Sequence, residues 1–257
     1  MLVRMSSIHL EAAGDVAVLR MAHGKANTLD TELCREVAER LDEVERDGYR
    51  AAVLTGTGGI FSAGVDLRRV RDGGRKYIAE FLPALSDAFL AVFGFTRPII
   101  AAVNGHAIAG GAVLAAACDQ RVLNTAHGRI GVTELLVGVP FPLAALEILR
   151  CAFGNRRLTE LTFLSRTYAG EQALALGLAD ELSEPEAVLP LAIGLAEQLA
   201  AIPPRAFAHT KAQIHRPFHE RIAENRSGDD AHVEELWASA ESLQSVSSYV
   251  EQTLERS

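Results

Sequence analysis

Residues 55–67 read TGTGGIFSAGVDL, a glycine-rich turn in which small residues precede Gly64. The apolar residues 51–55 before this turn predict a buried strand. A second unit of the same kind follows, where IIAAV (residues 99–103) leads through NGHAIAGG into an apolar helical run. Strands that alternate with helices predict an α/β layer fold, and the repeated unit suggests a spiral of similar layers.

The remaining sequence has the periodicities of further helices and strands. Apolar residues recur at helical spacing after Asp30 or Thr31, either of which can cap a helix, until Gly48 ends it. The same reasoning predicts a hairpin around residue 14, helices at 81–93, 143–151, 158–164, 169–180 and 187–201, and strands at 120–123 and 129–131. Residues 1–21 lack a continuous apolar segment, so we expect this hairpin there rather than a targeting peptide.

The C-terminal part of the sequence differs from what precedes it. Pro203 and Pro204 interrupt the helical pattern, so we divide the chain after residue 200 into a core and a helical tail. The tail is expected to hold a polar loop near 227–230 and a last helix. The apolar stripe of that helix comprises Leu236, Leu243, Val246, Val250 and Leu254. Such a stripe is typical of a segment that docks on another subunit.

The composition excludes several classes of function. Lys and Arg number 25 against 33 Asp and Glu, a net charge of −8, which argues against a protein that follows nucleic-acid phosphates. The three cysteines form no C-x-x-C pair, which indicates neither a disulfide framework nor a zinc site and favours the reducing cytoplasm. The basic run at 68–76 is read either as a solvated helix face or as a contact for ligand phosphates. The apolar stretch 99–118 contains Asn104, His106 and three glycines, so we expect buried core rather than a membrane span.

Four familiar signatures fail on particular residues. GTGGIF follows a strand like a dinucleotide-binding turn, but Phe61 stands where the third small residue is required. GHAIAGGA lacks the Lys and the Ser or Thr of a phosphate-binding loop, and Ser62 lacks the glycine two positions earlier that a nucleophile elbow needs. His215 and His219 lie four residues apart with Pro217 between them, and we interpret them as a surface helix terminus rather than a metal pair.

Four segments, taken together, carry a family resemblance. They are HGKANTLD (23–30), TGTGGIFSAGVDL (55–67), AAVNGHAIAGGAVLAAACD (101–119) and TELLVGVPFP (133–142). In this order and at these separations they resemble the crotonase (enoyl-CoA hydratase/isomerase) family over nearly the whole chain. The resemblance implies a ββα spiral core in residues 1–200, a tail in residues 201–257 that builds trimers or dimers of trimers, and an acyl-CoA thioester as ligand. Coenzyme A would enter as part of the substrate with no separate cofactor or metal, and neither nucleic acid nor a membrane is expected as a partner.

The resemblance also gives the glycine turns a chemical role. Reaction next to a thioester passes through an enolate, whose oxygen needs hydrogen-bond donors already in place. By the family motif these donors are the main-chain N–H groups of Val65 and Gly110, the second at a helix N-terminus. The resemblance further places six residues beside the coenzyme A moiety or the acyl chain: Lys25, Ala26, Ala63, Gly64, Asp66 and Leu67. Lys25 could instead be a solvated turn residue, and Asp66 a helix cap.

The choice of reaction depends on one missing carboxylate. Where family hydratases carry the first of two glutamates, three residues after Gly110, this sequence has Val113; at the second position it keeps Glu134. A single base suffices to move a proton from C2 to C4 of a 3-enoyl thioester, so the pattern is most similar to that of Δ3,Δ2-enoyl-CoA isomerases. In that resemblance Phe141 walls the acyl pocket, and Val113 borders the ligand and helps to exclude water. We expect an apolar pocket to raise the pKa of Glu134 toward neutrality.

Three alternatives stay open at this point. Glu134 could be an ordinary acid in the first turn of a helix, where the helix dipole favours negative charge. Within the family, the enzyme could be a hydratase or could hydrolyse thioesters, with His106 or His127 as the partner of Glu134. The chain could also bind acyl-CoA without turning it over.

Overall fold

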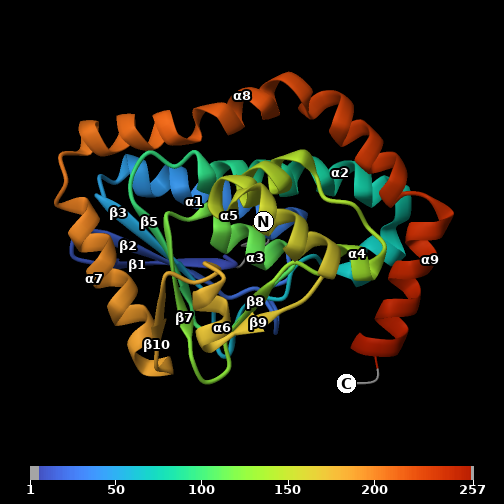
Figure 1. The fold of residues 1–257 in the computed structure, drawn as a ribbon, viewed down its shortest axis with the longest axis horizontal. Coiled ribbons are helices and arrows are strands. Elements are labelled where there is room, and N and C mark those ends of the chain that lie inside the picture. The colour runs from blue at the N-terminus through green and yellow to red at the C-terminus, as the bar shows by residue number, and fades with distance from the viewer. Residues whose placement is uncertain (1–5, 256–257) are drawn as a thin grey trace, which may run out of the picture.

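The computed structural model describes residues 6–255, which form two β-sheets surrounded by helices (Figure 1). The larger sheet has the strand order β1-β2-β3-β5-β7-β10, and the smaller has the order β4-β6-β8-β9. Two parts of the sequence-based expectations lie outside the described residues, namely residues 1–5 of the N-terminal segment and the side chain of Leu254 in the apolar stripe.

The larger sheet is parallel except at its first strand. Its strands are β1 (Ile8–Ala13), β2 (Val16–Met21), β3 (Ala51–Thr55), β5 (Ile99–Val103), β7 (Gln120–Asn124) and β10 (Glu181–Ser183). β1 pairs with β2 in the predicted antiparallel hairpin, and the later pairings are parallel. Every residue of β3 and β5 is buried. Burial on both faces explains why these two strands read as continuous apolar runs rather than as an alternation.

Each repeat of the chain contributes one strand to the larger sheet and the next strand to the smaller sheet. β4 (Ile60–Ser62), β6 (His106–Ile108) and β8 (Arg129–Gly131) follow β3, β5 and β7 in the sequence, and the short β9 (Tyr168–Ala169) pairs with β8. A helix comes next after each of β4, β6 and β8. The chain thus repeats two strands and a helix, and the predicted ββα spiral is confirmed.

Helices cover both faces of the larger sheet (Figure 1). They are α1 (Thr31–Arg46), α2 (Leu67–Phe93), α3 (Gly110–Ala117), α4 (Glu134–Val137), α5 (Leu143–Leu164), α6 (Gly170–Ala175), α7 (Val188–Ala200), α8 (Pro204–Trp237) and α9 (Ala240–Tyr249), with short turns at Pro185–Ala187 and Val250–Leu254. On one face, Val188, Ala192 and Ala196 of α7 pack against the sheet. The other face joins α1, α2 and α3 in the main hydrophobic core. The position of these helices therefore follows from the two apolar faces of a fully buried sheet.

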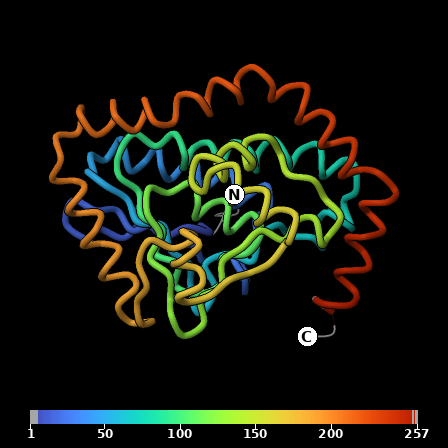
Figure 2. The backbone as a smooth tube through the Cα atoms, in the orientation of Figure 1, coloured from blue at the N-terminus to red at the C-terminus, as the bar shows by residue number. Residues whose placement is uncertain are grey.

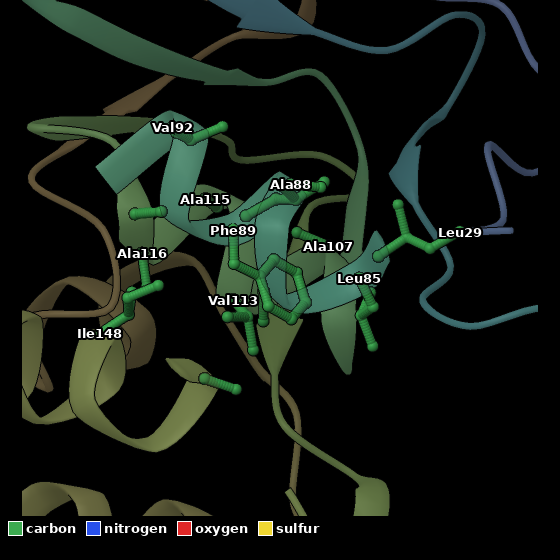
Figure 3. Packing of buried hydrophobic residues seen from close by; sticks show 14 of the residues in the cluster. Leu29, Leu85, Ala88, Phe89, Val92, Ala107, Val113, Ala115, Ala116 and Ile148 are labelled. Carbon is green, nitrogen blue, oxygen red and sulfur yellow. The ribbon is translucent and has the colours of Figure 1, made fainter. Parts of the chain in front are cut away.

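Two predictions from local sequence are confirmed. The Asp30 side chain accepts a hydrogen bond from Leu33 N at 2.8 Å and so caps α1. The apolar stretch 99–118 is buried core, made of β5, β6 and α3. Figure 3 shows how its side chains pack, with Val113 of α3 near the ring of Phe89 from α2.

Several predicted boundaries are wrong. The helix predicted at 81–93 begins earlier, at Leu67, and is interrupted at Gly74 (φ 53°). The basic run at 68–76 lies in its first part, in agreement with the reading of that run as part of a helix. The helix predicted at 169–180 is only α6. The loop predicted near 227–230 does not exist, since α8 continues through it and Arg226 Nε pairs with Asp230 Oδ2 at 2.9 Å, one helical turn away.

The tail also places three residues differently from the prediction. Leu236 lies on α8 rather than on the last helix and is 39% exposed, whereas Val246 and Val250 of the predicted stripe are fully buried. His215 and His219 lie inside α8 rather than at a helix terminus, and the His215 ring stacks on Phe93 with 3.9 Å between the ring centroids. Both histidines therefore contact the aromatic ring of Phe93 in the core. The spacing of the two residues in the sequence does not reveal this contact.

The C-terminal helices fold back over the core. In Figure 2 the orange-to-red trace follows one edge of the molecule and then turns along its side. α8 packs on α5 and α2, and α9 packs on α2 and α4. Within residues 6–255 no single helix is long and apolar enough to cross a membrane; one pair, Pro185–Ala200 with Pro204–Trp237, meets the criteria of length and composition across a bend of 103°.

Candidate active site

The two glycine turns that were predicted to act together lie against each other. Gly64 has a φ of 85°, in the left-handed region that favours glycine. A Cβ atom at Gly64 would lie 2.8 Å from Ile108 O and 3.3 Å from Gly110 N, closer than a carbon normally comes. The backbone at residue 64 can therefore approach the start of α3 only because it carries no side chain.

The N–H groups of Val65 and Gly110 are left unused by the local secondary structure. Leu29 N donates to Gly64 O at 2.8 Å, and Asp66 N donates to Leu29 O at 3.0 Å. This parallel bridge uses the polar groups on either side of Val65 and leaves the Val65 N–H out. Gly110 is the first residue of α3, so its N–H has no partner inside that helix. Both predicted donors thus stand in backbone positions suited to binding an anionic oxygen.

The start of α3 is packed directly on the first turn. A Cβ at Gly111 would lie 2.4 Å from Ser62 O, so the two backbones are in contact there as well. The preceding Ala109 has a φ of 51° and donates its N–H to Gly131 O at 2.9 Å, which ties the helix start to β8. Close packing of three chain segments fixes the relative position of the two turns.

Glu134 is the first residue of α4 and is 8% exposed. Among the described residues, its Oε2 atom is buried and has no hydrogen-bond partner. Burial disfavours the charged carboxylate and raises its pKa to about 7, although the main-chain N–H groups of Glu134 and Thr133 act in the opposite direction. A buried carboxyl that has one oxygen without a partner and a pKa near neutrality is suited to take up and return a proton.

A cavity of about 200 Å³ is lined by Val65 and Glu134. Six of the predicted site residues line it, from three separate segments of the chain: Ala26, Ala63, Val65, Asp66, Leu67 and Glu134. The fold therefore brings the HGKANTLD loop, the first glycine turn and the glutamate to one cavity.

Five predicted residues are not part of that lining within the described chain. Lys25 is exposed, which agrees with its alternative role as a solvated turn residue. Gly64 and Gly110 take part through the backbone contacts described above. Val113 is fully buried and Phe141 is 6% exposed, and both belong to the main core (Figure 3 for Val113).

Asp66 combines two of the predicted roles. It lines the cavity, and its Oδ1 accepts hydrogen bonds from Arg68 N and Arg69 N, both at 3.1 Å. These bonds cap α2, so the carboxylate is already engaged by the helix start. Glu134 therefore differs from Asp66 in having a carboxylate oxygen that no described group satisfies.

Two aromatic residues of the tail line the cavity, and the sequence analysis missed both. Trp237 comes from the end of α8 and Tyr249 from the end of α9. The sequence pattern predicted only that the tail docks on another subunit. The one signal in the sequence was that the single tryptophan of the chain stands at the end of a long, polar helical stretch. The remaining lining residues are Thr28, Arg68, Ile108, Ala109, Thr133, Val137 and Val139.

The other candidate groups lie outside the cavity. His106 and His127 are not among its lining residues in the described part of the chain, and the buried Nδ1 atom of His106 has no hydrogen-bond partner there. Residues 6–255 contain no cluster of three or more His, Cys, Asp or Glu side chains that could hold a metal ion. The cavity therefore brings together one buried carboxyl group, that of Glu134, and the turn that holds Val65, which lies in backbone contact with the start of α3 at Gly110.

The amino-acid sequence is similar to those of known proteins. Residues 11–255 match the family model described as enoyl-CoA hydratase/isomerase. The chain is 37% identical over 191 residues to a putative enoyl-CoA hydratase of Thermus thermophilus, which covers 73% of this chain and 75% of that protein. It is 28% identical over 222 residues to the mitochondrial enoyl-CoA delta isomerase 1 of Homo sapiens, which covers 85% of this chain and 74% of that protein.

The fold is also similar to that of a solved structure. Human mitochondrial delta3-delta2-enoyl-CoA isomerase matches with a TM-score of 0.93 at 26% identity, covering 98% of this chain and 99% of that one. The family model spans nearly the entire chain, and the likeness in structure includes the C-terminal helices. The chain therefore belongs to the enoyl-CoA hydratase/isomerase, or crotonase, family.

Proposed function

We propose that this acyl-CoA enzyme is an isomerase that moves the double bond of a 3-enoyl-CoA into conjugation with the thioester. The observation that carries the proposal is the carboxyl of Glu134 in the cavity, whose buried Oε2 atom has no hydrogen-bond partner among the described residues, with apolar Val113 at the position of the other family glutamate. A hydratase needs two groups to hold and activate a water, whereas an isomerase needs one base.

The reaction follows from these groups without a net change in atoms. Ionised Glu134 takes a proton from C2, and the electron pair of the C–H bond moves into an enolate. The N–H groups of Val65 and Gly110 stabilise the charge on the thioester oxygen, each contributing about 3 kcal/mol to the lowering of the barrier. Protonated Glu134 returns the proton at C4, the double bond shifts to C2–C3, and the carboxylate is restored.

The pKa of Glu134 suits both halves of this cycle. At a value of about 7, the carboxyl is substantially ionised at neutral pH and is still acidic enough when protonated to return its proton. A base whose pKa lies near the working pH gives the best compromise between the correct protonation state and the driving force for proton transfer.

Replacing Glu134 with Gln tests the proposal. The amide has nearly the shape of the carboxyl and cannot accept the C2 proton, so we expect kcat with a 3-enoyl-CoA to fall by at least about 100-fold. Affinity for a saturated acyl-CoA should stay within about threefold of that of the unchanged enzyme. Glu171→Gln is the matched control, because Glu171 is an exposed acid in the first turn of α6. Turnover by Glu134→Gln at the rate of this control would contradict the assignment.

A hydratase is the second candidate, because one relative at 37% identity is named a putative enoyl-CoA hydratase. Turnover of a panel of 2-enoyl and 3-enoyl CoA esters, followed by mass spectrometry and absorbance, separates the two reactions. Hydration adds the mass of water to a 2-enoyl ester, whereas isomerisation leaves the mass unchanged. Tight binding without turnover of any ester would favour the third candidate, a silent acyl-CoA-binding protein.

Other features of the proposal stay predictions. They are assembly into trimers or dimers of trimers through residues 201–257, a cytoplasmic location, and no cofactor apart from the coenzyme A of the substrate. The free state of Cys34, Cys118 and Cys151 is compatible with a reducing compartment. Exposed Leu136 and Phe163, at 65% and 75%, are apolar enough to lie in a subunit interface.

A further inference from the structure

The end of α8 and all of α9 form a structural unit that reaches the cavity, which we call the C-terminal elbow (residues 237–249). Trp237 at its start is 1% exposed although it belongs to a helix with few buried residues. Its ring lies 6.4 Å from that of Phe81, centroid to centroid, at an angle of 52°. The elbow is therefore anchored in the core of its own chain.

Hydrogen bonds fasten the elbow to the segment that follows the Glu134 helix. Trp237 Nε1 donates to Pro140 O at 2.8 Å, and Ser242 Oγ donates to Gly138 O at 2.9 Å. A Cβ at Gly138, whose φ is 80°, would lie 2.8 Å from Ser245 Cβ, so α9 touches the backbone there. Both carbonyls flank Val139, which lines the cavity.

The lining of the cavity is mixed in chemistry. Asp66, Arg68 and Thr28 supply polar groups, and Val137, Val139 and Trp237 supply apolar surface. An acyl chain is expected to leave water for the apolar surface, since burial of each methylene group is favourable. The indole of Trp237 is the largest side chain of this lining, so it fills space that a longer acyl chain would otherwise need.

We infer that Trp237 sets the acyl-chain length that the enzyme accepts, by acting as a fixed wall of the acyl pocket. The inference rests on the proposed acyl-CoA site. The ring cannot move aside easily, because that would leave the part-buried Pro140 carbonyl without its donor and would break the contact with Phe81. The expected substrates are therefore short- and medium-chain 3-enoyl-CoA esters, and chains that extend beyond the wall should bind more weakly.

Replacing the indole with a smaller apolar side chain should shift this preference. In Trp237→Leu, the ratio of kcat/KM for 3-dodecenoyl-CoA to kcat/KM for 3-hexenoyl-CoA is expected to rise by about tenfold or more, since each methylene that gains a place in an apolar pocket is worth about tenfold. Trp237→Phe removes less volume, and we expect a rise of about threefold. Val233→Ala is the matched control, because Val233 is an equally helical residue one turn earlier, 6% exposed and not among the described cavity residues.

A binding measurement keeps this inference separate from the proposed reaction. Dissociation constants of butanoyl-, hexanoyl-, octanoyl- and dodecanoyl-CoA are measured for the same four proteins, all checked for folding by circular dichroism. Long chains that gain affinity in the Trp237 variants but not in Val233→Ala support the wall, even if no enoyl ester is turned over. An unchanged length profile in the folded Trp237 variants, or no binding of any acyl-CoA to the unaltered enzyme, overturns it. If Trp237→Leu does not fold, the threefold shift in Trp237→Phe decides.

Discussion

At the scale of single residues, Glu134 shows a conflict between activity and stability. A carboxyl group with an unsatisfied buried oxygen is poorly solvated, and the same lack of solvation brings its pKa to about 7. Buried carboxylates elsewhere in this chain are paired: Glu147 Oε2 accepts from Arg221 Nε at 2.8 Å. The unsatisfied Oε2 atom of Glu134 therefore lowers the stability of the folded protein. The proposed reaction gives a reason for keeping this group in the site.

The effect of Glu134 on stability should depend on pH. In the unfolded chain its pKa is near 4.5, and in the folded protein it is about 7, so between these values the folded state binds more protons. The contribution of Glu134 to the free energy of unfolding therefore becomes less favourable as pH rises from about 4.5 to 7. Glu134→Gln should be more stable than the unaltered protein by about 3 kcal/mol near pH 8, and by less than about 1 kcal/mol near pH 5. Urea denaturation at equal protein concentration measures both differences; equal values at the two pH conditions would show that the carboxyl is not strained.

At the scale of elements, the site depends on how two turns and one helix start meet. β4 ends at Ser62 and β6 ends at Ile108, and these two strands are parallel neighbours in the smaller sheet. The segments that follow them must therefore leave the sheet at the same edge. Glycine at 64 and 111 then allows the two backbones to touch. The approach of Val65 to Gly110 is a consequence of strand order and of missing side chains.

Adding one methyl group at residue 64 should disturb this contact. Gly64→Ala places a Cβ at a positive φ and 2.8 Å from Ile108 O, whereas Gly14→Ala places one at a φ of 60° in open space. We expect Gly14→Ala to lower the free energy of unfolding by about 1 kcal/mol, and Gly64→Ala to lower it by at least about 2 kcal/mol more, because the backbone must shift. Turnover should fall only in Gly64→Ala. Urea denaturation and the isomerase assay measure these effects. Equal losses of stability and activity in both variants would show that the close contact between Gly64 and Ile108 is not required.

At the scale of the whole molecule, the tail encloses the core and reaches the site. α8 runs along α5 and α2 before the chain turns into α9 (Figures 1 and 2). Trp237 and Tyr249 of the C-terminal elbow line the cavity. Lys211, in the first half of α8, joins this helix to the core, with Nζ 2.8 Å from Asp119 Oδ1. Asp119 Oδ2 also accepts the N–H of Ile99 at the start of β5. This ion pair and the elbow thus join distant parts of the tail to the core.

The buried ion pair should matter more than an exposed one on the same helix. Lys211 and Asp119 have side chains that are 7% and 15% exposed, and Lys211→Ala would leave Asp119 without its partner, at a cost of about 3 kcal/mol. Arg226 pairs with Asp87 at side-chain exposures of 28% and 63%, so Arg226→Ala should cost less than about 1 kcal/mol. Adding Asp119→Asn to Lys211→Ala should recover part of the loss, because the amide is neutral and can still accept from Ile99 N. Urea denaturation of the four proteins checks this order, and similar costs for both single variants would contradict it.

The amino-acid sequence by itself determined the repeating ββα units, the two glycine turns and the exchange of a family glutamate for Val113. These features are local, because a turn glycine, a helix cap such as Asp30 or an apolar strand depends on neighbours only a few residues away. Only the tertiary structure decided that Glu134 is buried without a partner and that Trp237 and Tyr249 wall the cavity. It also decided that α8 runs unbroken through 227–230. Such contacts join segments about one hundred residues apart, as Trp237 joins Pro140, and they arise from packing and desolvation, which no local pattern records.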